Sequence, residues 1–449
     1  MTFDEGLLSP LTVGHDQEVT DAAALDALVS AEVALVRALA RLGIAPPETG
    51  DEVSSALGWR AGAHVDVDVD VAALAESAAS GGNAVIPLVS MIKAQVPEAY
   101  RRWVHRGVTS QDILDTALML VARRATIEID GTLCEVGMAL ADFASRHRDE
   151  VAAARTLTQH AVPTTVGARA AGWLRSVLAA RRRLSDVSEH LPAQLGGAGG
   201  TLASFVEIAG TEHARALPAA YAAELGLATP DAPWHTDRRP VTELGDALVQ
   251  VLDALGKMAS DVATLARTEI GELSEGAGGG SSAMPQKQNP VAAVLIRSAA
   301  LRAPQLGATL HLASTLASDE RPDGAWHAEW PTLRELLRLA LGASASASGM
   351  IEGLRVDHNA VKRNLAATRG LIISERLSLV LGDRIGPERL ATLVDAVRAG
   401  GDLAELVRAL PESAGEDIDA LVDPVGYTGL AGVFVDAARR RALDHEEPE

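Results

Sequence analysis

Apolar side chains recur at helical spacing through the middle of the chain. In the clearest run, steps of three and four residues alternate, which places the apolar side chains along one face of a helix. This run comprises Val241, Leu244, Leu248, Val251, Leu255, Met258, Val262 and Leu265. A second run comprises Val166, Ala170, Trp173, Val177, Leu184 and Val187. Both runs predict long helices that pack against other helices along their length.

Related patterns predict long helices over 109–147, 290–317 and 329–351, with a kink at Pro304 because proline lacks the backbone N–H. Clusters of glycine, proline and aspartate divide the first hundred residues into short helices and loops. Shorter helices are predicted toward the C-terminus, over 357–382, 387–399, 402–409, 415–421 and 428–442. The final DHEEPE is predicted to be a disordered tail.

These patterns predict an all-α fold. We expect an elongated central helical bundle over 106–345, with smaller helical domains over 1–105 and 346–449. Apolar faces this long bury more surface than one chain can cover, which predicts a homo-oligomer. No repeat of fixed period is present in the sequence.

The tract HVDVDVDV, residues 64–71, imitates the alternation of a half-buried strand. Three aspartates on one strand face would repel one another, and the helical sequence VAALAESAA follows at once. We therefore interpret the tract as the start of a helix, with acidic residues near the positive end of its dipole. A solvated acidic face is the favoured interpretation over a metal site.

The composition narrows the classes of function. Hydrophobic residues make up 47% of the chain and aromatics only 3%, which favours closely packed helices rich in alanine and leucine. The formal net charge of -20 argues against nucleic acid or an anionic membrane as a partner. The single cysteine, Cys134, excludes an intramolecular disulfide and fits a reducing cytoplasm. The sequence has neither a signal-like start nor an apolar stretch long enough to span a bilayer.

The segment GGGSSAMPQKQNP, residues 278–290, concentrates chemical groups between two predicted helices. Its glycines allow backbone N–H groups to approach a ligand closely. Ser281 or Ser282 can transfer a proton, and Lys287 and Asn289 can donate to a developing oxyanion. A plain Gly/Ser linker would not need Met-Pro, Lys and Asn-Pro at this join, so a reactive loop is the favoured interpretation.

This segment resembles the signature loop GSSxMPxKxNP of the fumarase/aspartase superfamily. Every fixed position matches from Gly280 to Pro290, including Ser282 and Met284. The resemblance implies that Ser281 exchanges a proton with the carbon beside a carboxylate. It also implies that Lys287 and Asn289 hold the carboxylate on which negative charge develops.

Two other segments resemble conserved regions of the same superfamily. HRGVTSQD contains His105, Arg106, Thr109, Ser110 and Gln111, and the resemblance implies that its threonine and serine bind a substrate carboxylate. TSQD is also a capping box, and a helix N-terminus can do both. In TLTQH, the resemblance implies substrate contacts from Thr158 and Gln159, and a general acid in His160. The Gly-rich segment 194–204 resembles the stretch before the next helix, with a plain connector as the alternative.

Three further blocks resemble 3-carboxymuconate cycloisomerases, one group within the superfamily. These blocks are WHAEW at 326–330 preceded by ERP at 320–322, PWHT at 233–236, and GNAVIP at 82–87. They make Arg321, Trp326 and His327 further candidate site residues, although two tryptophans and a histidine also suit packing at a domain junction. Gln286 and Gln288 stand where many relatives carry histidine and arginine, so two cations that would suit a third carboxylate are missing.

The resemblance implies closure of a lactone, in which one carboxylate of a muconate attacks the substrate's own double bond. Either Ser281 or His160 could supply the proton to carbon. The cationic cluster Arg101, Arg102, His105 and Arg106 would attract a polyanion or form a solvated turn. Alternatives are an adenylosuccinate-type lyase that releases fumarate, and an inactive helical scaffold. We expect no cofactor and no metal, a small polycarboxylate as substrate, and, from the resemblance, a homotetramer.

Overall fold

The computed structural model of the chain describes residues 5–60, 65–276, 279–280, 284 and 287–444. It confirms the predicted all-α fold, since the described strands are short and isolated in pairs. Within the described ranges, none of the helices combines the length and the apolar character needed to cross a bilayer. Ser281, Ser282, Gln286 and the predicted tail from residue 445 lie outside the described residues.

The chain forms two compact units, each assembled from three stretches of sequence. Unit 1 comprises Met1–Gly131, Ala180–Asp253 and Ala299–Ala345. Unit 2 comprises Thr132–Ala179, Ala254–Ser298 and Ser346–Glu449. Every boundary between them falls inside one of five long helices: α5 (Ser110–Arg146), α6 (Val166–Glu189), α8 (Arg239–Leu265), α9 (Val291–Thr315) and α10 (Gly324–Gly353). The predicted three-domain division stays a prediction.

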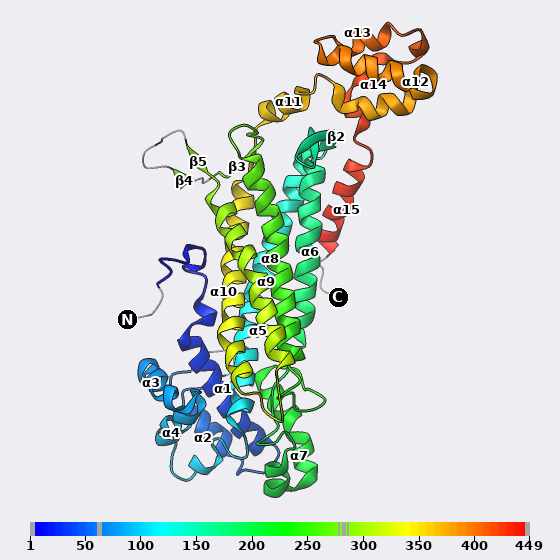
Figure 1. Cartoon of the computed structure of the whole chain (residues 1–449). Helices are drawn as coiled ribbons and strands as arrows, with labels where there is room; N and C mark the ends of the chain where they lie inside the picture. Colours follow the sequence, from blue (N-terminus) through cyan, green and yellow to red (C-terminus); the bar gives the residue numbers. More distant parts are fainter. Residues whose placement is uncertain (1–4, 61–64, 277–278, 281–283, 285–286, 445–449) are drawn as a thin grey trace. The chain divides into compact units, whose positions relative to one another are not determined.

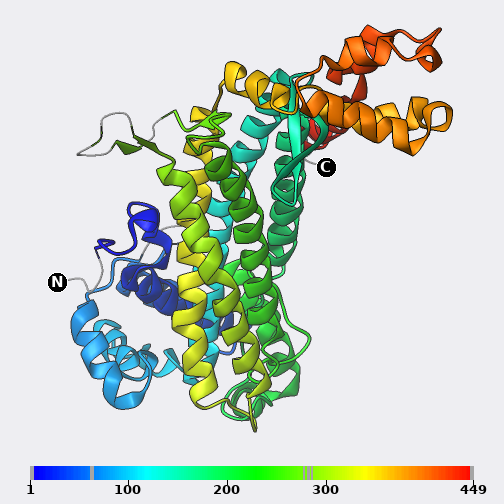
Figure 2. The same ribbon diagram turned by 45° about the horizontal axis from the view of Figure 1, so that its top comes forward.

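Within each unit, stretches of these five helices lie side by side (Figures 1 and 2). Every member of the two predicted apolar runs is buried, from Val166 to Val187 on α6 and from Val241 to Leu265 on α8. In unit 1, a Cβ on Gly245 of α8 would lie 2.5 Å from Cδ1 of Leu310 on α9, so the helices approach closely there and a larger residue would require the Leu310 side chain to shift. α9 continues through Pro304, where we predicted a kink.

Unit 1 also contains several shorter helices. They are α1 (Asp21–Arg41), α2 (Thr49–Ala56), α3 (Val71–Gly81), α4 (Val85–Gln95) and α7 (Ala203–Leu225). α1 packs against α2 and α7 (Figure 1). Residues 65–70 form no strand, and Asp70 caps α3 by accepting from the Ala72 and Ala73 N–H groups. The interpretation of this acidic tract as the start of a helix is therefore confirmed.

Unit 2 contains a β-hairpin that the sequence interpretation missed. Strand β1 (Val151–Thr156) pairs antiparallel with β2 (Gln159–Thr165), which leads directly into α6 (Figure 2). The other strands are two-residue pairs: β3 (Leu273–Ser274) with β6 (Arg355–Val356), and β4 (Gly279–Gly280) with β5 (Gln288–Asn289).

The C-terminal part of unit 2 contains α11 (His358–Ala366), α12 (Ser374–Arg398), α13 (Leu403–Arg408), α14 (Ile418–Val422) and α15 (Ala431–Asp444). α12, α13 and α14 pack together as a small helical cluster, whereas α15 contacts β2. The single helix predicted over 357–382 was wrong, because the chain leaves α11 through Arg369 and Gly370 in left-handed conformations before α12 begins. Gly386 interrupts α12 in the same way. Ile372, Leu377 and Val397 belong to the buried cluster that holds α12, α13 and α14 to Ala153 of β1.

Candidate active site

The segment that carries Thr109 and Ser110 opens the 37-residue helix α5 in unit 1. Half of the predicted capping box is present: the Asp112 carboxylate accepts from the Thr109 N–H at 3.0 Å. The Asp112 N–H in turn donates to the Thr109 carbonyl at 3.0 Å, instead of to its hydroxyl. This arrangement keeps the Thr109 hydroxyl out of the cap, at a helix N-terminus that favours an anion.

Asp112 is fully buried and connects three segments of unit 1 that are distant in sequence. Its carboxylate accepts from the N–H groups of Gly196 at 2.8 Å and Gly197 at 2.9 Å. It also accepts from His235 Nε2 at 2.7 Å. With the Thr109 N–H, four donors surround two oxygens, which is about the full capacity of an ionised carboxylate. The TSQD, Gly-rich and PWHT segments therefore meet at one side chain.

Asp115, one turn further along α5, forms a second buried centre. It accepts from Gln111 Nε2 at 3.1 Å, from Trp326 Nε1 at 2.9 Å, and from both terminal nitrogens of Arg238 at 2.7 and 3.0 Å. Arg238 also donates to Glu329, at 2.6 Å through one terminal nitrogen. Burial raises the pKa of Glu329, and the hydrogen bond and charge of Arg238 oppose that rise without cancelling it.

The candidate residues Gln111 and Trp326 both take part in this buried hydrogen-bond network. Both side chains are buried, and Gln111 also donates to the His235 carbonyl at 2.9 Å. Through these bonds the two side chains connect α5 with α10 and with the segment that precedes α8. The predicted packing role of the WHAEW tryptophans is confirmed, since Trp326 and Trp330 meet edge to face with centroids 4.7 Å apart.

His105 and Arg106 precede this helix in a tight turn. His105 adopts a left-handed conformation with φ 57°, and both its N–H and its Nδ1 donate to the buried carboxylate of Glu32, at 3.0 and 2.6 Å. The Arg106 guanidinium lies over the Trp103 ring, 5.3 Å from its centroid. A residue 73 positions away thus anchors the turn that leads to Thr109.

The two other candidates in unit 1 bond to backbone carbonyls. Arg321 donates to the Ala198 carbonyl at 3.1 Å, within the Gly-rich segment. His327 Nε2 bonds to the Gly82 carbonyl at 3.1 Å. The GNAVIP and ERP-WHAEW blocks are therefore joined to the same part of unit 1.

In unit 2, the segment TLTQH lies at the tip of the β1–β2 hairpin. Thr156 pairs with Gln159, so Leu157 and Thr158 form a two-residue loop. Both have positive φ, 49° and 70°, a conformation that favours glycine or asparagine. Leu157 is 95% exposed, and Thr158 and Gln159 are exposed as well. Thr158 and Gln159, the candidate substrate-binding residues at this tip, therefore lie on or beside a strained turn.

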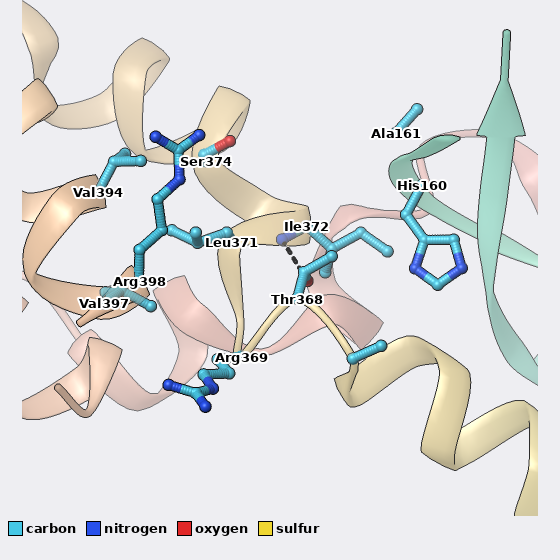
Figure 3. Close-up of a pocket in the computed structure, with 11 residues that line it drawn as sticks. His160, Ala161, Thr368, Arg369, Leu371, Ile372, Ser374, Val394, Val397 and Arg398 are labelled. Carbon is cyan, nitrogen blue, oxygen red and sulfur yellow. Dashed lines mark hydrogen bonds between the residues drawn. The ribbon is translucent and has the colours of Figure 1, made fainter. Parts of the chain in front are cut away.

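His160 follows this turn and borders a cavity of about 460 Å³. Figure 3 shows its ring on one side and Thr368, Leu371 and Ile372 on the other. Burial and then the charge of Arg155 lower the pKa of His160, and Glu272 opposes them. A lowered pKa keeps this imidazole neutral near pH 7, so it can accept a proton there.

Glu272 is the buried carboxylate of this region. Arg155 donates to it at 2.5 and 3.1 Å, Asn364 donates at 2.8 Å, and Arg169 lies 3.6 Å away. Burial alone would raise the pKa of Glu272, but these partners hold it below its usual range. No local pattern in the sequence indicated this cluster, because Arg155 and Asn364 lie 117 and 92 positions from Glu272.

The structure describes the signature loop at residues 279–280, 284 and 287–290. Gly279 pairs with Asn289 and Gly280 with Gln288, which brings the two arms of the loop together. Met284 and Lys287 are exposed, and the Lys287 N–H donates to the Met284 carbonyl at 2.9 Å. Glu275 accepts from the N–H groups of Ala292 and Ala293 at 3.1 and 2.8 Å, which caps α9 directly after Asn289.

Comparison with known proteins places this geometry in context. A sequence profile described as a lyase family matches residues 12–304. A nitrosuccinate lyase from Streptomyces davaonensis is 46% identical, with 97% of this chain and 94% of the relative aligned. A 3-carboxy-cis,cis-muconate cycloisomerase from Pseudomonas aeruginosa is 41% identical over 93% of this chain and 92% of the relative. The crystal structure of 3-carboxy-cis,cis-muconate lactonizing enzyme from Pseudomonas putida superposes with a TM-score of 0.85 at 34% identity, covering 95% and 96% of the two chains.

Proposed function

Because the chain belongs to the lyase family of the fumarase/aspartase superfamily, we propose that it converts 3-carboxy-cis,cis-muconate into a lactone. The observation that carries this proposal is the buried network around Asp112 and Asp115. It ties the N-terminus of α5 to His235 and Trp326, which belong to the blocks that resemble cycloisomerases. The 41% identity to the cycloisomerase from Pseudomonas aeruginosa supports the same choice.

The proposed reaction begins with one substrate carboxylate held at the start of α5. The hydroxyls of Thr109 and Ser110 and the positive end of the helix dipole would bind it. Another substrate carboxylate attacks the double bond, a C–O bond forms, and the displaced electron pair passes to the carbon beside a carboxylate. That carboxylate becomes a dianion in its aci form, and Lys287 and Asn289 are the proposed donors to it, supplied by other copies of the chain in the homotetramer, with sites built from three chains, that the resemblance implies.

Protonation of that carbon completes the lactone. The lowered pKa of His160 makes it a better proton acceptor than donor near neutral pH. We therefore assign proton donation to Ser281 and a supporting role in proton transfer to His160. The sequence alone left these two residues equivalent, and the burial of His160 together with the charge of Arg155 is what distinguishes them.

A second candidate is the elimination of nitrite from nitrosuccinate. Two observations favour it: the 46% identity to a nitrosuccinate lyase, and the neutral amides of Gln286 and Gln288. A base would remove a proton from the carbon beside a carboxylate, the C–N bond of the next carbon would break, and nitrite would leave with its electron pair, giving fumarate. Nitrosuccinate carries two carboxylates instead of three, so it needs fewer cations around it.

The test compares three substrates with the purified protein. We expect loss of the diene absorbance of 3-carboxy-cis,cis-muconate without release of fumarate or nitrite. Equal amounts of fumarate and nitrite from nitrosuccinate, with the muconate unchanged, would replace our first proposal with the second. Release of fumarate from adenylosuccinate would instead identify the protein as an adenylosuccinate-type lyase, the alternative that the sequence suggested.

Ser281→Ala is the matched variant for whichever substrate reacts. It should lower kcat by about 10²-fold or more, since proton transfer by a positioned group contributes roughly that factor. Turnover of none of the three substrates would contradict the proposal and favour an inactive scaffold. Full activity of Ser281→Ala would instead contradict the proton-donating role assigned to Ser281.

A further inference from the structure

His235 lies in the core of unit 1, behind the N-terminus of α5, and the sequence did not single it out as a site residue. Its side chain is 4% exposed. The neighbouring Trp234 is fixed through its backbone N–H, which donates to Gln194 Oε1, and through its Nε1, which donates to the Ala193 carbonyl, both at 3.0 Å. The His235 carbonyl accepts from Gln111. The backbone around His235 is thus held independently of its imidazole.

The imidazole makes one bond that the rest of the network cannot replace. Of the four donors found on Asp112 within the described chain, three are backbone N–H groups, from Thr109, Gly196 and Gly197. His235 Nε2 is the side-chain donor, at 2.7 Å. Removal of this donor would leave a buried, ionised carboxylate short of one hydrogen bond, and bonds to charged groups are the strong ones.

The second ring nitrogen of His235 is buried without a partner among the described residues. A Cβ on Gly200 would lie 3.5 Å from Nδ1, and a Cβ on Gly196 would lie 2.7 Å from Cε1. The ring therefore fills the space beneath the Gly-rich turn while only Nε2 takes part in the network. A side chain that supplies a donor at the Nε2 position should be sufficient.

We propose that His235 is a positioning residue, which acts through Asp112 to hold the Thr109–Ser110 turn and the Gly196–Gly197 turn in the conformation that binds a substrate carboxylate. The inference rests on the proposed function, because it takes the start of α5 as the carboxylate site. A turn that binds the carboxylate throughout the reaction contributes equally to ground state and transition state. Its loss should therefore raise KM and leave kcat nearly unchanged.

His235→Asn and His235→Gln form a matched pair. The glutamine amide nitrogen reaches the position of Nε2, whereas the asparagine amide nitrogen reaches only the position of Nδ1. We expect His235→Asn to raise KM about 10- to 100-fold with kcat within about threefold, as one charge-assisted hydrogen bond is lost. His235→Gln should stay within about threefold of the wild-type KM.

Thr126→Val is the control for a purely structural loss. It removes the buried bond between the Thr126 and Ser188 hydroxyls, 2.6 Å long, which lies in unit 1 and shares no atom with the Asp112 network. It should lower the free energy of unfolding and leave KM unchanged. A rise in KM for Thr126→Val as large as that for His235→Asn would overturn the proposal.

Backbone hydrogen exchange provides a readout that needs no substrate. Peptides covering 105–112 and 194–200 should exchange faster in His235→Asn than in the wild type, and at the wild-type rate in His235→Gln. Unchanged exchange and KM in His235→Asn, or an equal rise in exchange and KM in both variants, would overturn the proposal.

If His235→Asn does not fold, His235→Gln decides: wild-type KM and exchange support the proposal, and a raised KM with fast exchange refutes it. If no substrate reacts with the wild type, the exchange result still stands, so failure of the proposed function is recognised separately.

Discussion

The two units both contain a buried carboxylate cluster beside candidate site residues, but the clusters are built differently. In unit 1, Asp112 and Asp115 are fully buried and are held by backbone N–H groups and by side chains that are themselves buried. In unit 2, Glu272 is held by Arg155 and Arg169, each 17% exposed, beside a hairpin with a strained tip. The side-chain partners of Asp112 and Asp115 are thus buried, whereas the arginines beside Glu272 reach some solvent; in the proposed function the first cluster would hold a ligand and the second would support proton transfer.

The charges of the two clusters also differ in sign. Arg238 lies between Asp115 and Glu329, which leaves an excess of negative charge, and the pKa of Glu329 is raised. Around Glu272 two arginines face one carboxylate, and the pKa values of Glu272, Arg169 and His160 are all lowered. Burial first, and then the charge of Arg155, lowers the pKa of His160 and favours its neutral form, in a protein whose net charge is -20.

The largest expected effect is on the cluster of unit 1. Arg238→Met removes a fully buried cation from between two buried carboxylates, so it should lower the free energy of unfolding by about 3–5 kcal/mol in urea denaturation. Arg302→Met is the control, because its pair with Glu335 is half exposed and should contribute less than about 1 kcal/mol. If the two variants lost similar free energies of unfolding, burial would not make the Arg238 ion pairs stronger than the exposed Arg302 pair.

A smaller, pH-dependent effect is expected in unit 2. Glu272→Gln should lower the free energy of unfolding by about 2–3 kcal/mol at pH 7, because Arg155 and Arg169 lose their counter-charge but reach some solvent. A lowered folded pKa stabilises the protein above the ordinary value of 4.5, and this stabilisation is lost as pH falls through the folded value.

The difference between wild type and Glu272→Gln should therefore be constant near neutral pH and shrink below pH 4.5. Urea denaturation at several pH values measures it. Asp142→Asn, which breaks an exposed pair with Arg146, is the control and should change stability by less than about 1 kcal/mol at any pH. A difference that grows as the pH falls would contradict the sign of the pKa shift.

Much of the fold follows from local periodicity, which is why the sequence predicted it. The apolar runs on α6 and α8 are buried throughout, and Asp112 forms its half of the predicted capping box. The β1–β2 hairpin was missed because VAAARTLTQHAVPTT neither alternates clearly nor contains a glycine or asparagine at its turn. Its left-handed Leu157 and Thr158 are stabilised by strand pairing, a tertiary effect with no local signal.

The candidate site residues that lie in a sequence motif could be predicted, whereas those defined only by contacts between distant segments could not. TSQD, TLTQH and the signature loop were found as motifs, whereas Glu32, Glu272 and the role of His235 depend on pairs 73 to 123 positions apart. Periodicity describes which face of a helix is buried, and it does not identify the partner on the other helix. Buried polar partners therefore required the structure.

The smallest expected effect tests the strain at the hairpin tip. Leu157→Asn should raise the free energy of unfolding by about 0.5–1 kcal/mol, because asparagine tolerates positive φ better than leucine. Little burial is lost, since Leu157 is 95% exposed. Leu379→Asn is the control: that leucine is 73% exposed on helix α12, where asparagine is the poorer helix former and should destabilise by a few tenths of a kcal/mol.

Because the Leu157→Asn variant would keep the turn geometry, its kcat/KM should stay within about twofold of wild type. A stability gain joined to a large loss of kcat/KM would instead mean that the leucine side chain itself contacts the substrate or another copy of the chain.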